Sequence, residues 1–197
     1  MNTNTLEQLI QNWKTDPTVK EHVVFSKTIP PTPAKLSSFP HDLNERLARA
    51  LQADQIHQLY SHQLSAWDKI QKGVNTAITT GTASGKSLCY YLPILNSFFQ
   101  HTGTCSLFLF PTKALAQDQE KTLRNLLIKS GENKELEKWI GIYDGDKPGE
   151  KRKSVKKDAR FVFTNPDMLH QGILPYHNSW SRFFRNLQYI VIDEMHT

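Results

Sequence analysis

A chain of 197 residues, 38% of them hydrophobic and 22% charged, is long enough for one ordinary domain and an appendage but too short for two full-sized domains. It has no secretory signal and no apolar run near the roughly 20 residues of a membrane-spanning helix, so we expect a cytoplasmic protein and exclude an integral membrane protein. A net charge of +5 is compatible with nucleic acid as a partner. The two cysteines, Cys89 and Cys105, form no CxxC pair, and both are expected in the core.

Residues 1–58 are expected to form a mostly helical N-terminal accessory extension. A short amphipathic pattern over residues 6–13 precedes the proline-rich stretch 30–40, which cannot form a regular helix or a central strand. A second helical pattern covers residues 43–51, and Asp42 is its expected N-cap.

From Asn75 onward, short apolar runs with β character alternate with helical segments. These runs cover residues 76–79, 106–110, 140–143, 160–163 and 188–192. Strands that alternate with helices predict a parallel α/β sheet flanked by helices. Because ligands bind at the carboxyl ends of such strands, the segments directly after the runs are where chemistry is expected.

The segment after the first run has the features of a phosphate-binding loop. It consists of Thr80, Gly81, Thr82, Ala83, Ser84, Gly85, Lys86 and Ser87, and a helical pattern follows it. Backbone N–H groups at a helix N-terminus attract oxyanions, so the loop is predicted to bind ATP, with Lys86 at the β and γ phosphates and Ser87 on Mg²⁺. The position five before Gly85 is threonine instead of glycine, and the alternative interpretation is a small-residue turn.

The last run ends in two adjacent carboxylates, Asp193 and Glu194. A metal-dependent NTPase needs such a pair at a strand end, so we assign Asp193 to Mg²⁺ and Glu194, with Lys86, to catalysis, Glu194 accepting a proton from the attacking water. The alternative is a solvated acidic pair in a turn. The run before the pair is apolar enough to be buried on both faces, as in a central parallel strand, which favours the nucleotide site.

Residues 193–196, Asp-Glu-Met-His, resemble the DExH box, and the chain from about residue 59 to 197 resembles the first RecA-like domain of a superfamily 2 helicase. The resemblance implies an incomplete RecA-like P-loop NTPase domain over residues 59–197. Residues 59–63 resemble the upstream glutamine motif, which implies that Gln63 reads the adenine edge. By the same analogy, His196 couples the ATP site to the nucleic-acid surface.

Residues 111–119 are similar to motif Ia of that family and residues 164–170 to motif Ib, both of which touch the nucleic-acid backbone. Short polar side chains at strand ends and helix starts also suit phosphate oxygens by themselves. The predicted nucleic-acid contacts are Thr112, Lys113, Thr164 and Asn165. Asn165 is in addition the expected cap of a helix.

The segments GTASGKSLCYYLP, FPTKALAQDQ, YDGD and TNPDMLHQGILP are similar to the DNA-repair helicase group that contains bacterial mitomycin repair factor A and the fungal RecQ-like helicase. This resemblance implies DNA before RNA as the partner, and ATP-driven translocation with 3′ to 5′ polarity. The basic run 147–157 is either a phosphate-contacting patch or a solvated helix face, and the aromatic residues near 180–184 are expected in the core.

The resemblance places a second RecA-like domain and an arginine that stabilises the transition state beyond Thr197. Such an arginine is worth about three to five orders of magnitude in rate, so we expect the isolated chain to bind ATP and nucleic acid but to lack full ATPase and unwinding activity. An unpaired edge on the last strand and poor solubility are also expected. Alternatives are a small P-loop kinase, a non-catalytic nucleic-acid-binding module with a vestigial nucleotide site, and an RNA helicase.

Overall fold

The structure is a computed structural model that describes residues 3–27, 30, 33–81, 84–145 and 149–194, and its contacts divide the chain into two compact units, Met1–Ala34 and Lys35–Thr197. The first unit contains α1 (Thr3–Thr15) and α2 (Pro17–Lys20). The α2 N-cap is Asp16, whose carboxylate accepts hydrogen bonds from the Thr18 hydroxyl and backbone N–H, and these bonds lower its pKa. Across the described residues, no helix combines the length and the apolarity that crossing a bilayer requires.

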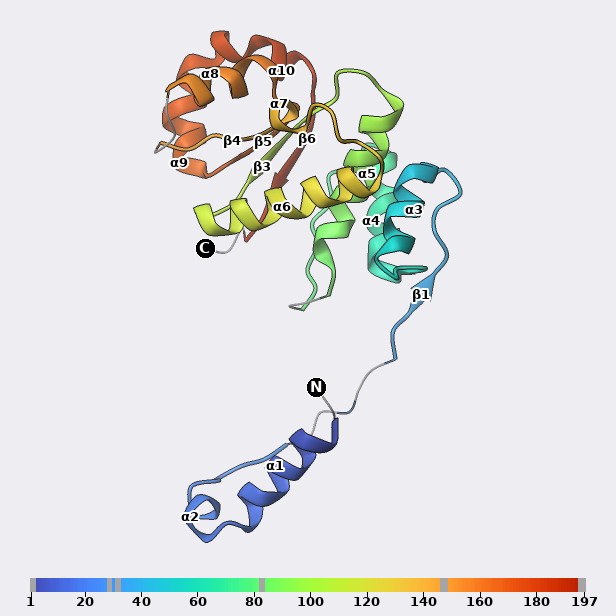
Figure 1. Ribbon diagram of the computed structural model, residues 1–197, viewed down its shortest axis with the longest axis vertical. Helices are drawn as coiled ribbons and strands as arrows, with labels where there is room; N and C mark the ends of the chain where they lie inside the picture. Colours follow the sequence, from blue (N-terminus) through green and yellow to red (C-terminus); the bar gives the residue numbers. More distant parts are fainter. Residues whose placement is uncertain (1–2, 28–29, 31–32, 82–83, 146–148, 195–197) are drawn as a thin grey trace. The chain divides into compact units, whose positions relative to one another are not determined.

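The second unit alternates strands and helices along the chain (Figure 1). It begins with β1 (Leu36–Ser37), α3 (Glu45–Ala53), β2 (Leu59–Tyr60), α4 (Ser61–Gln71), α5 (Lys86–Gln100), β3 (Cys105–Leu109), α6 (Lys113–Lys129) and α7 (Leu136–Trp139). It continues with β4 (Ile140–Ile142), α8 (Gly149–Asp158), β5 (Phe161–Thr164), α9 (Pro166–Met168), the π-helical η1 (Leu169–Ile173), the 3-10 helix η2 (Leu174–Trp180), α10 (Ser181–Arg185) and β6 (Leu187–Ile192).

The main sheet is parallel and has the strand order β4-β5-β3-β6. Leu107 on β3 pairs with Val162 on β5 and with Ile190 on β6, which fixes the register of the three strands. The predicted parallel sheet flanked by helices is therefore confirmed. Because all four strands point the same way, the segments that follow them meet at one edge of the sheet.

The first predicted strand is absent from the structure. Residues 76–79 carry no strand, because a strand requires backbone hydrogen bonds to a neighbour and the described residues supply none there. The expected burial of residues 188–192 on both faces is also wrong: β6 is an edge strand, and the side chains of Ile190 and Ile192 are 58% and 51% exposed. The expected unpaired edge on this last strand is present in the described sheet.

Alternating side chains of β3 and β5 supply two cores, one on each face of the sheet. Phe108 and Phe163 stack with ring centroids 4.5 Å apart on the face covered by α3, α4, α5 and α6. On the other face Leu107 packs with Trp180 and Phe183, which are buried as predicted. Both cysteines are buried as well.

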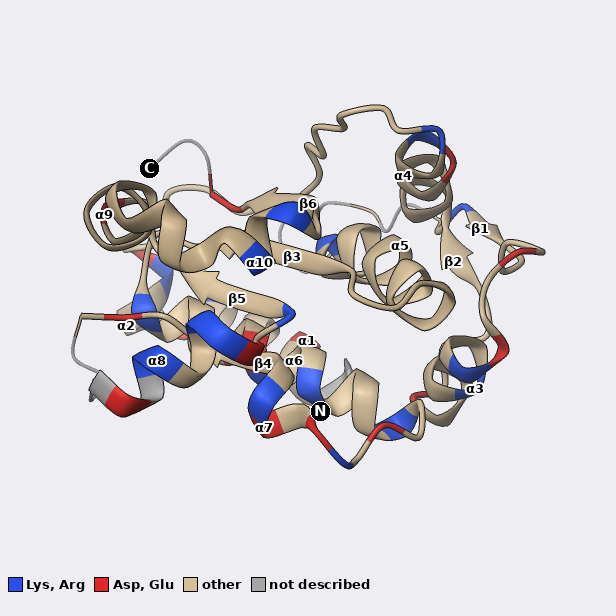
Figure 2. Ribbon diagram, turned by 90° about the horizontal axis from the view of Figure 1, so that it is seen from above, with Lys and Arg blue, Asp and Glu red and all other residues tan. Residues whose placement is uncertain are grey.

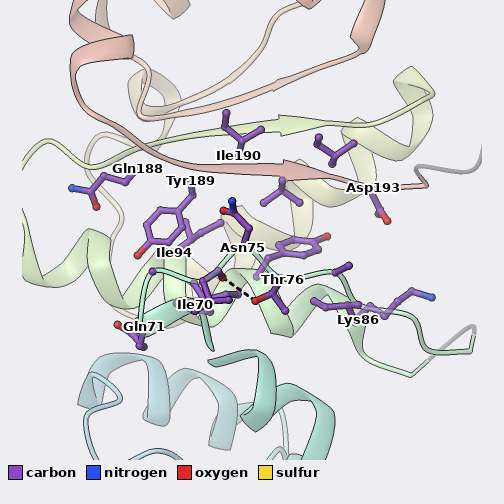
Figure 3. A pocket seen from close by; sticks show the side chains of 18 of the residues that line it. Ile70, Gln71, Asn75, Thr76, Lys86, Ile94, Gln188, Tyr189, Ile190 and Asp193 are labelled. Carbon is purple, nitrogen blue, oxygen red and sulfur yellow. Dashed lines mark hydrogen bonds between the residues drawn. The ribbon is translucent and has the colours of Figure 1, made fainter. Parts of the chain in front are cut away.

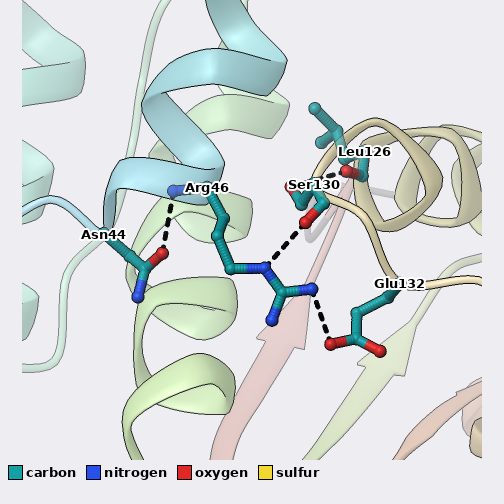
Figure 4. A network of polar contacts seen from close by, with 5 residues as sticks. All are labelled: Asn44, Arg46, Leu126, Ser130 and Glu132. Atoms are coloured by element: carbon teal, nitrogen blue, oxygen red, sulfur yellow. Dashed lines mark hydrogen bonds and ion pairs between the residues drawn. The ribbon is translucent and has the colours of Figure 1, made fainter.

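Helix α3 belongs to the second unit, and Arg46 joins it to the segment that ends α6 (Figure 4). Its Nε donates to the Ser130 carbonyl oxygen at 2.7 Å, its Nη2 lies 2.6 Å from Glu132 Oε1, and its guanidinium covers the ring of Phe99. The contacts divide the chain after Ala34, and the expected end of the N-terminal extension at residue 58 stays a prediction. The N-cap of α3 is Asn44, whose side chain accepts from the Arg46 N–H at 2.9 Å, so the prediction of Asp42 as the cap is wrong.

Candidate nucleotide site and nucleic-acid interface

The described part of the phosphate loop folds around its own lysine. Gly85 is the N-cap of the 15-residue α5 and adopts a left-handed conformation with φ +74°. The Lys86 Nζ donates to the carbonyl oxygens of Thr80 and Gly81 at 3.1 and 3.2 Å, and the hydroxyls of Thr80 and Ser84 are hydrogen-bonded at 2.7 Å. Thr82 and Ala83 lie outside the described residues. A lysine at the start of a long helix, beside a tight glycine turn, suits a bound phosphate.

The first turn of α4 supports this loop. The Gln63 Nε2 donates to the Gly85 carbonyl oxygen at 2.9 Å, and Gln63 Oε1 accepts from the Tyr60 N–H at 2.9 Å. The His62 Nε2 lies 3.1 Å from the carbonyl oxygen of Ser84. Gln63 is 2% exposed, so its amide is engaged inside the protein, and contact with an adenine edge would require it to exchange these partners. The His62 contact was not predicted from the sequence.

The backbone at the end of β6 fixes the two predicted catalytic-site carboxylates. The Asp193 N–H donates to the Leu109 carbonyl oxygen at 3.0 Å, which extends the ladder between β3 and β6 by one residue. Glu194 turns away from the strand with φ +54°, and its N–H donates to Asp193 Oδ1 at 3.0 Å. His196 lies outside the described residues. The main chain thus holds Asp193 rigidly at the carboxyl end of the sheet, where acidic residues follow β6 in Figure 2.

Tyr90 connects the two predicted magnesium ligands. Burial raises the pKa of its phenol to about 12, with a smaller contribution from the Asp193 carboxylate and against an opposing hydrogen bond with the Ser87 side chain. Ser87 and Asp193, more than a hundred positions apart in the sequence, therefore act on one phenol. A hydroxyl and a carboxylate in this arrangement are oxygen ligands of the kind Mg²⁺ takes together with phosphate oxygens.

A cavity of about 790 Å³ lies between segment 73–80, which forms no strand in the described structure, and β6. Lys86, Asp193 and Glu194 are among its lining residues. Figure 3 shows the side chains of Lys86 and Asp193 at one end of it and those of Gln71 and Gln188 at the other. The volume falls in the range of roughly 300–1,000 Å³ typical of small-molecule sites. The charged end therefore has the residues to hold a magnesium-bound triphosphate.

The four residues predicted to contact nucleic acid lie at the carboxyl ends of β3 and β5, at the same edge of the sheet. Thr112 caps α6 by accepting from the Leu115 N–H at 3.3 Å, and Asn165 caps α9 by accepting from the Met168 N–H at 2.7 Å, as expected. The hydroxyl of Thr164 is buried and donates to the Tyr143 carbonyl oxygen at 2.9 Å.

Lys113 Nζ lies 2.9 Å from Asp144 Oδ2. Asp144 was not among the predicted site residues, although it follows a strand in the sequence, which is the signal that could have found it. Of the basic run, Lys153 and Lys157 on α8 are exposed, and Figure 2 shows that α8 carries much of the positive charge of this region.

Comparison with known proteins identifies the family. The model of the DEAD/DEAH box helicase family matches residues 60–197. The chain is 44% identical to the ATP-dependent helicase YprA of Bacillus subtilis over 197 residues, which is 100% of this chain and 25% of that protein. It is 41% identical to the ATP-dependent helicase hrq1 of Schizosaccharomyces pombe over 86% of this chain and 16% of that protein. The chain thus spans a quarter or less of the length of these relatives.

Solved structures agree with this assignment. The crystal structure of the helicase MrfA bound to DNA and AMPPNP superimposes with a TM-score of 0.81 and 46% identity, covering 85% of this chain and 23% of that one. The DEAD-box helicase Mss116 shares the fold at 21% identity with a TM-score of 0.61 over 79% of this chain. The fold is therefore RecA-like, and the chain belongs to the DEAD/DEAH box helicase family.

Proposed function

We propose that this chain is the ATP-binding motor module of a DNA helicase or translocase that works in DNA repair. The observation that carries the proposal is the common cavity lined by Lys86, Asp193 and Glu194. Support also comes from the helicase MrfA, whose structure holds DNA and AMPPNP and superimposes on this chain. DNA is the proposed nucleic-acid partner, and preferential binding of RNA by this chain would contradict that choice.

ATP with Mg²⁺ would supply the phosphoanhydride whose hydrolysis drives movement. Lys86 would leave the carbonyl oxygens of Thr80 and Gly81, which it now contacts, and place its ammonium against phosphate oxygens instead. Ser87 and Asp193 would hold the metal. Glu194 would accept the proton of the attacking water, and its place beside the fixed Asp193 backbone suits it to that role.

Nucleic acid would cross the same edge of the sheet, at the ends of β3 and β5. The N-terminus of the 17-residue α6 presents backbone N–H groups and the ammonium of Lys113 to phosphate oxygens. Thr112, Thr164 and Asn165 would chiefly shape this surface, because their side chains are hydrogen-bonded within the protein. ATP and nucleic acid would therefore be held at neighbouring strand ends of one sheet.

The 197-residue chain is proposed to bind ATP and single-stranded DNA, to hydrolyse ATP barely and not to unwind DNA. Stepping requires two domains that close and open around ATP while each holds the strand. The described cavity presents a lysine and two carboxylates, whereas family members also use an arginine that stabilises the transition state.

A single-turnover ATPase assay with and without single-stranded DNA, together with binding of a fluorescent ATP analogue, tests this proposal. We expect measurable nucleotide binding that Lys86→Ala weakens strongly and that Glu194→Gln retains, because the first removes a phosphate contact and the second removes only the proton acceptor. Rapid DNA-stimulated turnover by this chain would contradict the proposed inactivity. Nucleotide binding unaffected by Lys86→Ala would contradict the site itself.

A further inference from the structure

One ion pair spans the proposed nucleic-acid surface. Lys113 is the first residue of α6 and follows β3, whereas Asp144 follows β4, and β5 lies between those two strands. Lys113 Nζ and Asp144 Oδ2 are 2.9 Å apart, so the pair passes over the carboxyl end of β5. The lysine side chain is 45% exposed and the carboxylate 16%, which makes the lysine the more accessible member.

The backbone holds Asp144 at this position. The N–H of the preceding residue, Tyr143, donates to the Phe163 carbonyl oxygen at 2.8 Å, and the Tyr143 carbonyl oxygen accepts from the buried Thr164 hydroxyl. Asp144 therefore starts from a fixed main chain and has a short side chain, whereas Lys113 has a long, flexible one. The lysine ammonium therefore has the greater reach of the two toward an approaching phosphate.

We propose that Asp144 sets the affinity for nucleic acid by competing with a backbone phosphate for Lys113. This inference rests on the proposed function, since it takes Lys113 as a phosphate contact. A lysine that binds phosphate gains free energy by releasing counterions from the polymer. Asp144 acts as a counterion of Lys113 within the protein, so Lys113 has to leave or share this carboxylate when it binds a phosphate. The Asp144 carboxylate also repels a nucleic-acid phosphate beside it.

Two features limit the size of this effect. A partly exposed ion pair contributes little by itself, and salt screens the repulsion between carboxylate and phosphate. We therefore expect Asp144→Asn to strengthen binding of single-stranded DNA about three- to tenfold at low salt, and less at high salt. Competition for Lys113 is lost in a Lys113→Gln background, where only the screened direct repulsion between Asp144 and phosphate is left, so the same substitution should there change affinity less than about twofold.

The test is a double-mutant cycle on the 197-residue chain, with fluorescence anisotropy of a labelled single-stranded oligonucleotide at several salt concentrations. Its variants are Asp144→Asn, Lys113→Gln and the double substitution, each checked for native circular dichroism. Asp118→Asn is the matched control. Asp118 lies on α6, the helix that begins with Lys113, and its side chain is 72% exposed and pairs with Lys121 at 3.7 Å. It makes the same change in net charge away from Asp144.

Stronger binding by Asp144→Asn than by Asp118→Asn, lost in the Lys113→Gln background, would support the proposal. Equal effects of the two asparagine substitutions would overturn it, since net charge would then explain both. Weaker binding by Asp144→Asn would also overturn it, because Asp144 would then orient Lys113 for phosphate. If Lys113→Gln leaves the affinity for DNA unchanged, this inference is wrong, but the proposed function is not contradicted. A chain that binds no nucleic acid contradicts both.

Discussion

The side-chain amide of Gln63 donates a hydrogen bond to the carbonyl oxygen of Gly85 at 2.9 Å and so joins α4 to the turn that begins α5. The other end of the amide accepts from the Tyr60 N–H. Because Gln63 is buried, both contacts are sheltered from water. The geometry of the phosphate loop therefore depends on a residue more than twenty positions upstream.

Gly85→Ala should damage both folding and nucleotide binding. A Cβ at this position would lie 2.7 Å from Gln63 Nε2, and φ +74° disfavours any side chain by about 1–2 kcal/mol. We expect at least tenfold weaker binding of a fluorescent ATP analogue and a loss of unfolding free energy in urea. Gly73→Ala is the control, because Gly73 has the same φ but nothing within 4 Å of its Cβ. Equal effects of the two substitutions would show that contact with Gln63 does not matter.

Gln63→Ala separates two roles for this residue. If Gln63 only holds the phosphate loop in place, the affinities for ATP and GTP should fall together, because both nucleotides use the same phosphate site. Reading of the adenine edge, which the glutamine motif implies, predicts a loss of affinity for ATP and little change for GTP. Competition binding with the two nucleotides decides between them. Gln52→Ala, at an exposed position on α3, should leave both affinities unchanged.

The sequence predicted the sheet well where strands have partners in the described structure. Four of the five apolar runs became β3, β4, β5 and β6 to within about two residues, because alternating apolar residues on both faces leave little choice of conformation. Residues 76–79 have a similar composition, but no strand pairs with them among the described residues, so no ladder forms there. Local sequence predicts extended conformation, whereas strand formation depends on a neighbour.

The candidate site was predicted less completely. Motifs place Lys86 and Asp193 on segments that end at one sheet edge, and the structure lines one cavity with both. The contacts of Gln63 with Gly85 and of Lys113 with Asp144 were missed, since each joins side chains from separate elements whose approach depends on tertiary packing. The cap at Asn44 was missed because Asp42, two residues earlier, is an equally good capping residue type.

Arg46→Ala should lower the unfolding free energy by about 1–3 kcal/mol, because it leaves the Ser130 carbonyl oxygen and Glu132 without this partner and removes a cation covering Phe99. Urea denaturation followed by circular dichroism measures the change. The control is Arg49→Ala on the same helix, whose pair with Glu45 is highly exposed and should contribute no more than about 0.5 kcal/mol. Similar losses for both variants would mean that α3 is not fastened by Arg46.

The Tyr90 phenol should make the fold sensitive to alkali. Its pKa is raised from 10.0 to about 12 in the folded chain, so folding favours the neutral phenol. That contribution is complete below pH 10 and is lost as pH rises toward 12. Tyr90→Phe should therefore show a shallower fall in unfolding free energy between pH 10 and 12, even though it loses the hydrogen bond to Gln119 at every pH. If the unfolding free energies of the Tyr90→Phe variant and of the unsubstituted chain fall equally steeply between pH 10 and 12, this role of Tyr90 is ruled out.

Lys86 and Asp193 are proposed to hold one magnesium-bound triphosphate, and nucleotide affinity measured with Mg²⁺ and with EDTA tests this most directly. We predict that Lys86→Ala weakens binding of ATP in both conditions, whereas Asp193→Asn removes most of the gain that Mg²⁺ gives and leaves the affinity in EDTA nearly unchanged. An Asp193→Asn chain that retains the full magnesium-dependent gain would contradict the claim.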